Sequence, residues 1–385
     1  MASANYAHLA IDDETTWGVL PSPVGLTKVR FTGDSFQHAK QTVVSNEIRP
    51  DRQVADLIEV GVDGSGGWEF ELSYGEILRY LPAALFSAFT SQATSKTVSL
   101  TAATGVVLGA AGDFANVAIG STIRIAGAVT PGNNGLKRVT AKAGDGSSIT
   151  LGTGEIVADE ASVAITISGQ TITNGTTVHS FLVEKKLKDG SFMSFRGVML
   201  NVLSLALTSR QIITGSIDTI GTQGYESTTT INNGGAAPAE PPADPVMSAS
   251  VHVGAVEENG VALADALKSM TLSINNNLRG NDAISCKSIF EVGIGECNVS
   301  GQMQAYFKTH ALLTRFIAHA TSTMRFILTD TAGNSLVISL PAVKFGGGNI
   351  SIEGKNTDIM LPLEWQAIRD ATLGYTIRVD AIAAA

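Results

Sequence analysis

Glu69 and Glu71 come nearest, by type and spacing, to a catalytic pair. They alternate with Trp68, Phe70 and Leu72 in a segment predicted to be a strand, so both carboxylates point to the same side. Two facing carboxylates are the groups that hydrolyse glycosidic bonds. However, charges on one side of a half-buried strand are also ordinary solvated positions. The pair alone therefore does not predict an active site.

Metal-binding and thiol chemistry find no better support. Six histidines are scattered along the chain, at His8, His38, His179, His252, His310 and His319. His310 and His319 lie nine positions apart on one predicted helix, so they cannot share a metal as an i, i+4 pair would. Cys286 and Cys297 have no CxxC spacing, which favours buried or idle structural thiols.

Neither of two glycine-rich segments has the pattern of a phosphate-binding loop. The segment 61–67 lacks the Lys-Ser or Lys-Thr ending of such a loop and precedes no helix, so it is predicted to form a β-turn. The same holds for 346–348. The sequence therefore predicts no catalytic, cofactor-binding or metal-binding residues and no cofactor, and the protein is not expected to be an enzyme.

The composition limits the remaining classes. A chain of 385 residues with 44% hydrophobic content can bury two or three cores, and 40 glycines with 6% aromatic residues are typical of short strands joined by tight turns. The net charge of −9 argues against tight binding of nucleic acid but not against a surface along which DNA slides. Residues 1–20 lack Lys and Arg, and no apolar run reaches the roughly 20 residues of a membrane span, so cytosolic synthesis is expected.

A repeated order of elements suggests an internal duplication. Residues 181–207 and 326–352 can be aligned without a gap at an offset of 145, and each predicts a strand, a tight turn and a long alternating strand. Apolar residues at helical spacing predict a helix near 75–89 before the first copy and one near 306–319 before the second. Each predicted helix follows a strand.

The segment 92–176 interrupts the first copy. It is poor in charge and rich in Val, Ile, Thr, Ala and Gly, and it predicts five short strands at 97–101, 122–126, 136–141, 148–151 and 162–168. We expect an inserted small β-barrel or sandwich domain on the outside of any assembly. The predicted domains are a first module at 1–91 and 177–231, this insert, a Pro-rich semi-extended linker at 232–245, and a second module at 246–385.

Four segments resemble the major tail tube proteins of long-tailed (siphovirus-type) bacteriophages: 14–18, 31–35, 45–53 and 67–75, the last reading Gly-Trp-Glu-Phe-Glu-Leu-Ser-Tyr-Gly. The similarity is strongest over 14–75, weaker over 179–230, and rests on element order in the C-terminal half. The resemblance implies a mainly β fold with two tandem tail-tube-type β-sandwich or barrel modules, each with a flanking α-helix, plus the small all-β insertion domain.

The same resemblance implies a structural virion protein whose partner is itself. Inner sheets of neighbouring subunits would form a continuous barrel, and rings would stack into a tail tube that conducts DNA during ejection. Two modules per chain predict rings of three chains with pseudo-sixfold symmetry, with six chains as the alternative. Other tail proteins would bind at the tip and terminator ends, DNA would pass without specific binding, and no membrane would be involved. The protein would be made in the cytoplasm of the bacterial host and reside in the virion tail.

Two segments are candidates for contacts between subunits. The polar stretch 41–56 is predicted to be a long loop, and residues 1–25 an extended arm; both would bridge to the next ring. A chain lacking residues 2–20 is then expected to fold but to polymerise poorly.

Other classes of protein share parts of this pattern. A β-rich surface-adhesion or carbohydrate-binding protein would have similar Gly- and Thr-rich strands, and glycan-array binding would favour it. A polysaccharide-degrading enzyme would need a cleft with paired carboxylates.

Overall fold

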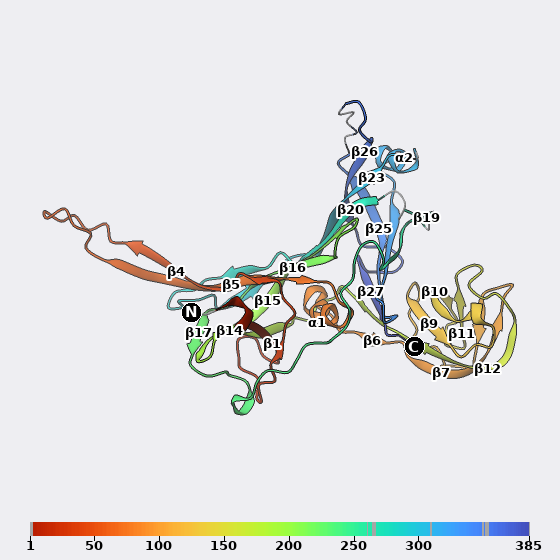
Figure 1. Cartoon of the computed structure of the whole chain (residues 1–385), viewed down its shortest axis with the longest axis horizontal. Helices are drawn as coiled ribbons and strands as arrows, with labels where there is room; N and C mark the ends of the chain where they lie inside the picture. Colours follow the sequence, from red (N-terminus) through yellow and green to blue (C-terminus); the bar gives the residue numbers. More distant parts are fainter. Residues whose placement is uncertain are drawn as a thin grey trace.

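The structure is a computed structural model that describes residues 3–259, 261–263, 267–308, 310–348, 350 and 354–384. The molecule is elongated, with a long hairpin projecting at one end and a small barrel at the other (Figure 1). Two α-helices are found in the described residues, α1 (Tyr74–Leu85) and α2 (Ala311–Ile317), and the rest of the regular structure is mainly strand. The expected mainly β fold class is confirmed.

The strands outside the barrel fall into two sequential groups. The first group is β1 (His8–Glu14), β2 (Thr27–Lys28), β3 (Gly33–Asp34), β4 (Gln37–Val44), β5 (Leu57–Glu71), β6 (Thr90–Ser91), β13 (Gln170–Thr173), β14 (Ser180–Lys188), β15 (Ser191–Thr208), β16 (Thr214–Ile220) and β17 (Gly224–Ser227). The second is β18 (Val253–Glu258), β19 (Val261–Ala262), β20 (Leu267–Asn275), β21 (Arg279–Asn281), β22 (Glu291–Gly293), β23 (Asn298–Tyr306), β24 (Ser322–Thr329), β25 (Ser335–Gly346), β26 (Met360–Ala367) and β27 (Arg378–Ile382).

One antiparallel sheet runs through both groups in the order β5, β16, β15, β20, β23, β26. The two groups join where β15 pairs with β20, from Val202 opposite Asn275 to Thr208 opposite Ser269. One hydrophobic core lies under this sheet and contains the largest buried side chains of both groups, including Trp68 and Trp365. Because α1 packs against both β15 and β20 from the core side, the helix holds the two groups of strands together.

Both predicted hairpins are present, but their residues do not correspond at a constant offset of 145 positions. Phe181 on β14 lies opposite Val198, whereas Phe326 on β24 lies opposite Ile338. An offset of 145 would place Val343 there, and Val343 instead pairs with Ser322. The turns therefore differ in position although the order of elements is the same. Residue 352, where the second alignment ends, lies outside the described residues.

The insert forms a closed six-stranded barrel in the order β10, β11, β8, β7, β12, β9. Its strands are β7 (Thr94–Thr101), β8 (Val106–Leu108), β9 (Thr122–Ala126), β10 (Gly135–Lys142), β11 (Ser148–Leu151) and β12 (Glu160–Ser168), around a separate apolar core. The five predicted strands are present, and β8 was missed because it is only three residues long. The barrel lies at the far end from the projecting hairpin (Figure 1). The predicted domain boundaries themselves stay a prediction.

A buried carboxylate fastens the barrel to the body. Asp380 on β27 accepts hydrogen bonds from the backbone N–H of Thr122 at 2.8 Å and from the hydroxyl of Thr171 at 2.7 Å. Burial raises the pKa of Asp380 to about 6, although these hydrogen bonds and Arg378 favour its charged form. Arg378 also donates to the carbonyl of Ile119 on the barrel side at 2.7 Å.

Asp380 should make stability fall as the pH rises from about 4 to about 6. The folded chain holds this proton up to a pKa of about 6, whereas the unfolded chain releases it near 3.8. The two-unit difference corresponds to ~3 kcal/mol at most. Asp380→Asn should remove this slope in thermal unfolding measured across the range, while Asp189→Asn, at an exposed site, should keep it. An unchanged slope in Asp380→Asn would contradict the assignment.

The two helices are shorter than predicted. α1 begins one residue earlier than expected and ends at Leu85, because Phe86 adopts a left-handed conformation with φ of 47°. Pro82 lies in the last turns of α1. α2 covers only 311–317 of the expected 306–319, since β23 continues to Tyr306.

The prediction of an extended N-terminal arm is wrong for residues 8–14. They form β1, which pairs with β14 from His8 opposite Lys186 to Glu14 opposite Ser180, and Leu9 and Ile11 are buried. The Glu14 carboxylate accepts hydrogen bonds from the N–H groups of Gly18 and Gly197, both at 2.9 Å. The start of the chain is thus part of its own sheet.

Removing residues 3–14 is therefore expected to destabilise the monomer rather than only its assembly. Leu9 and Ile11 would each lose about 1.5–3 kcal/mol of burial, and β14 would lose its partner along one edge. A drop in the unfolding temperature measured by circular dichroism would show this. Removing residues 3–6 alone, where no residue is buried, should leave the unfolding temperature nearly unchanged.

The predicted loop at 41–56 is also only partly correct. Residues 41–44 belong to β4, which pairs with β5, and the connecting loop is 45–56. The glycine-rich segment 61–67 is strand throughout rather than a β-turn. A Cβ at Gly67 would lie 1.8 Å from the carbonyl oxygen of Ile217, and one at Gly64 2.7 Å from the backbone of Gln223. These glycines allow neighbouring backbones to approach closely.

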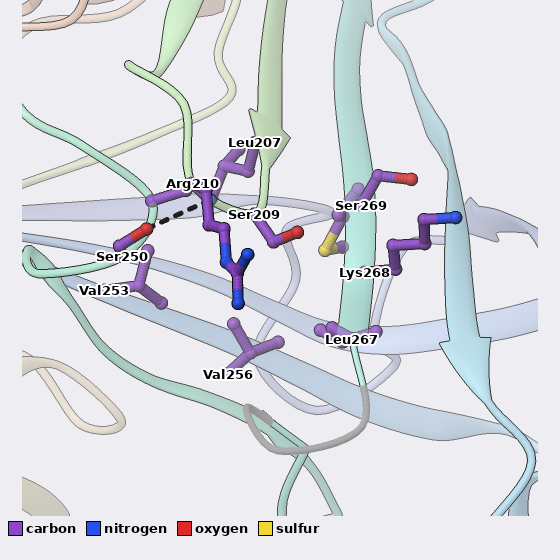
Figure 2. Close-up of a pocket in the computed structure, with 11 residues that line it drawn as sticks. Leu207, Ser209, Arg210, Ser250, Val253, Val256, Leu267, Lys268 and Ser269 are labelled. Atoms are coloured by element: carbon purple, nitrogen blue, oxygen red, sulfur yellow. Dashed lines mark hydrogen bonds between the residues drawn. The ribbon is translucent and has the colours of Figure 1, made fainter.

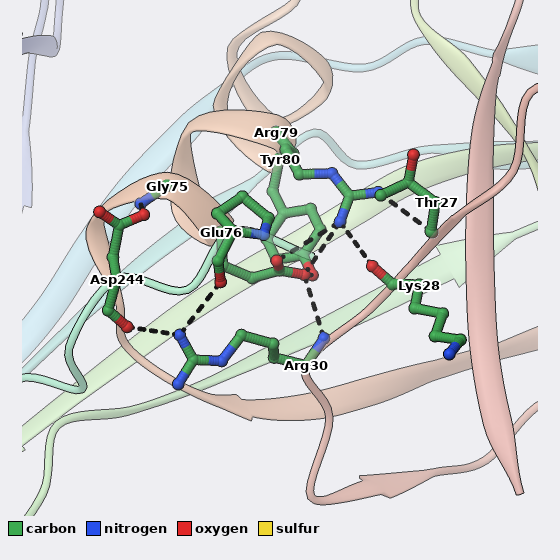
Figure 3. Close-up of polar contacts among 9 residues, drawn as sticks. Thr27, Lys28, Arg30, Gly75, Glu76, Arg79, Tyr80 and Asp244 are labelled. Atoms are coloured by element: carbon green, nitrogen blue, oxygen red, sulfur yellow. Dashed lines mark hydrogen bonds and ion pairs between the residues drawn. The ribbon is translucent and has the colours of Figure 1, made fainter. Parts of the chain in front are cut away.

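The linker at 232–245 is held against the first group of strands (Figure 3). Arg30 donates to the carbonyl of Asp244 at 2.6 Å, and the Asp244 carboxylate accepts from the N–H of Gly75 at 3.0 Å. Next to them the fully buried Glu76 accepts hydrogen bonds from Arg79 and from the hydroxyl of Tyr80. Burial and Glu76 raise the pKa of Tyr80 well above its usual value. This network joins α1, the strand region 27–30 and the linker.

Candidate functional surface

The continuous sheet has one apolar face and one polar face. Residues that alternate with the core side chains are the exposed or half-buried Glu69, Glu71, Thr214, Ser216, Asp218, Ser204, Thr271, Ser273, Gln302, Gln304, Glu364 and Gln366. Two shallow hollows of about 460 and 440 Å³ lie on this face and share Thr271. We call the side of the sheet that carries these exposed and half-buried side chains the polar face.

Carboxylates give the polar face its charge. Glu71 lies opposite Thr214 and Glu69 opposite Ser216, and Glu364 is on the next group of strands, opposite Gly346. Lys344, opposite Gln366, is a counter-charge on the same face. Asp218 on β16 is a fourth carboxylate of this face, and the remaining groups are hydroxyls and amides. Such a surface offers few cations to a phosphate backbone.

The sheet has a strand with one unpaired side at each end. At one end β3 pairs with β5, at Gly33 opposite Glu69. At the other end β25 pairs with β24 only as far as Val343, and beyond it with β26 alone among the described residues. Exposed strand edges are templates for pairing with another strand.

The structure places the sequence candidates apart from one another. Glu69 and Glu71 do point to one side, as part of the polar face. His310 precedes α2 and His319 follows its end, while His38 and His179 each contact a backbone carbonyl at 3.0 Å. No cluster of three potential metal ligands is found in the described part of the chain. Neither described helix has the length and apolar character to cross a membrane.

The two cysteines, predicted to be buried or idle thiols, have different surroundings. Cys286 is exposed, and Cys297 is half-buried. Burial raises the pKa of Cys297 to about 11, which leaves its thiol protonated and unreactive at neutral pH.

Sequence reasoning did not identify the polar face as a surface. A signal was present in 360–367, where every second residue is apolar and buried. The alternation shows that one side of each strand is solvated, but not that six strands share that side.

A comparison with protein families identifies this architecture. A family model described as "Phage tail tube protein" matches residues 4–367, and a search of curated proteins gave no match. The match covers the first group of strands with the barrel inserted in it, and the second group as far as β26. The chain therefore belongs to the phage tail tube protein family, whose members are structural proteins of the virion tail.

Proposed function

We propose that three copies of this chain close into a ring, that rings stack into the tail tube, and that DNA passes along the polar face during ejection. The observation that carries this proposal is the continuous sheet with an acidic polar face and, at each end, a strand with one unpaired side. Family membership supports assembly into a tube, and the ring of three follows from the two groups of strands in each chain.

The pairing of β15 with β20, which connects the two groups of strands within one chain, is the pattern for the pairing between neighbouring chains. β15 is the second strand of the hairpin in the first group and pairs with β20, which in turn pairs with β23. By the same order, β25 is the second strand of the hairpin in the second group, and β3 pairs with β5. We therefore assign the free side of β25 beyond Val343 to β3 of the next chain. Each chain then supplies two equivalent wall segments, and three chains close the ring.

Electron microscopy and native mass spectrometry test the assembly. Purified protein should form rings or tubes in negative stain, and released rings should have three times the mass of the chain. A mass of six chains would overturn the ring of three. A protein that stays monomeric at all concentrations, or that assembles into open filaments without a channel, would overturn the tube itself.

Charge reversal tests the role of the polar face. Tubes of the variant Glu69→Lys, Asp218→Lys, Glu364→Lys should retain DNA that wild-type tubes release, and the binding should weaken as salt rises. The matched control reverses Asp189 and Glu226, which are exposed and lie off the polar face. Equal DNA retention by both variants would contradict a polar face that lines the channel.

A further inference from the structure

The C-terminal end of α1 is covered by the second group of strands. The side-chain amide of the buried Asn276, which follows β20, donates to the carbonyls of Ala84 on α1 and Leu200 on β15, both at 3.1 Å. Phe86, directly after the helix, belongs to the same buried cluster as Leu278. Within the chain, the end of this helix is therefore part of the contact between the two groups.

The two groups also meet at the other end of the same strand pair. Figure 2 shows the end of β15 beside the start of β20, where Leu207 of the first group and Val256 and Leu267 of the second line one cavity. The cavity holds about 240 Å³, which is below the roughly 300 Å³ of typical small-molecule pockets. Inside the chain the two groups thus cover each other at both ends of the β15–β20 pairing.

Helix α2 has the corresponding place in the second group, but its end is exposed. Each helix precedes the hairpin of its group, and each is followed by a residue in a left-handed conformation with φ of 47°, Phe86 after α1 and His319 after α2. Ile317 therefore corresponds to Ala84. Ile317 is 70% exposed and His319 is exposed, whereas Phe86 is only 4% exposed.

The rest of α2 is held firmly in place. Leu312 is buried, and Phe316 packs against the main hydrophobic core. Arg315 forms an ion pair with the buried Glu258, and the helix packs against β25 as α1 packs against β15. An apolar side chain on such a fixed support can bind another chain with little ordering cost.

The strand register identifies the surface that would cover the end of α2. In the first group β3 and β4 run along β5 in one register, as β20 runs along β23 in the second. The pairs that show this are Gly33 with Glu69 and Ala39 with Asp63, and Ser269 with Gln304 and Asn275 with Asn298. Glu71 has the place of Tyr306, since they lie opposite the first residues of β16 and β26. Counted from there along β5 and β23, Lys40 has the place of Asn276.

Lys40 has chemistry that suits the end of a helix. Its ammonium can donate hydrogen bonds, as the amide of Asn276 does to the end of α1. A cation is also favourable beside the last carbonyls of a helix. Lys40 is exposed, and its ion pair with Glu59 at 3.2 Å is a surface contact, which is worth little.

We propose that the C-terminal end of α2 packs against segment 33–44 of the next chain in the ring. Ile317 is covered there, and the ammonium of Lys40 from the next chain donates to the last carbonyls of the helix. The next chain thus does for α2 what the second group of strands does for α1 within the chain. This inference rests on the proposed ring.

A disulfide trap tests the contact directly. In a chain with Cys286→Ser and Cys297→Ser, the pair Ile317→Cys and Lys40→Cys should form disulfides between chains, because docking brings their Cα atoms within about 7 Å. The cross-linked products on a denaturing gel should stop at the number of chains in the ring. A ladder without limit would place the contact between rings and overturn the inference. The matched pair Ile317→Cys and Val129→Cys, whose second site is a barrel position that is 80% exposed, should give no cross-link.

Charge at the end of α2 gives an independent readout. Ile317→Asp should raise the protein concentration needed for ring formation at least about tenfold, because it places a carboxylate beside the negative end of the helix. Lys40→Glu should act in the same direction, while Lys40→Arg, which keeps the donor, should assemble as the wild type does. Val129→Asp is the matched control.

Two results would overturn the inference while leaving the proposed function intact. One is the absence of the Ile317–Lys40 cross-link from assembled rings, and the other is ring formation by Ile317→Asp at the wild-type concentration. A wild-type protein that forms neither rings nor tubes would instead overturn the proposed function, and this inference with it.

Discussion

Replacing Glu76 with alanine is expected to lower the free energy of unfolding by about 3 kcal/mol, because a buried ion pair loses one partner. The carboxylate has no exposed surface, and it accepts hydrogen bonds from the Tyr80 hydroxyl, from Arg79 at 3.3 Å and from the backbone N–H of Arg30 at 3.3 Å. Alanine would leave the buried Tyr80 hydroxyl without this acceptor, and an unpaired buried polar group carries its full desolvation cost.

Urea unfolding followed by circular dichroism measures this loss. Glu76→Gln keeps the shape and one acceptor oxygen, so its loss should be intermediate. Glu69→Ala, which removes an exposed carboxylate nearby in sequence, should change the stability by less than about 0.5 kcal/mol. If Glu76→Ala and Glu69→Ala lost equal stability, the network would not hold α1 against the linker.

Gly301→Ala is expected to cost a further large amount, about 3 kcal/mol, through overpacking. A Cβ at Gly301 would lie 2.0 Å from the carbonyl oxygen of Thr271 and 2.4 Å from the ring of the buried Trp365. Neither group can move away easily, since the Thr271 carbonyl belongs to the backbone of the adjacent strand and the Trp365 ring is part of the core. The β20–β23 pairing must therefore separate locally, which distorts the polar face near Gln302.

The matched control for Gly301 is Gly346→Ala. Gly346 is on β25 of the same sheet, and a Cβ there would meet nothing within 4 Å. Thermal unfolding of the two variants should differ by more than 5 °C in their midpoints, roughly the shift that a few kcal/mol give in a large domain. Equal midpoints would mean that the sheet relaxes around Gly301 without loss.

Local patterns predicted both helices, the two hairpins and five strands of the barrel. The apolar alternation of 203–207 and the apolar spacing in α1 and α2 each follow from neighbouring residues, so they are visible in the sequence. β1 was missed because Asp12, Asp13 and Glu14 make it look like a polar leader. Its burial comes from β14, about 170 positions away, and no local signal reports that partner.

Glycine was the least reliable guide. The segment 61–67 has the composition of a turn, yet its glycines serve contacts with backbones from distant parts of the chain, such as Ile217 and Gln223. The polar face likewise depends on pairing between distant parts of the chain. Each strand shows its own alternation, but the common side emerges only when β15 pairs with β20, and that pairing joins residues about 70 positions apart.

The long strand β15 determines how the molecule would bear mechanical load. The first half of β15 pairs with β14, and its second half pairs with β16 and β20. One uninterrupted backbone therefore connects the β14–β15 hairpin to the continuous sheet. Tension along this strand acts perpendicular to its ladder hydrogen bonds, which must then shear together instead of opening one after another. A filament built from such subunits would resist stretching along this strand, because the ladder hydrogen bonds carry the load together.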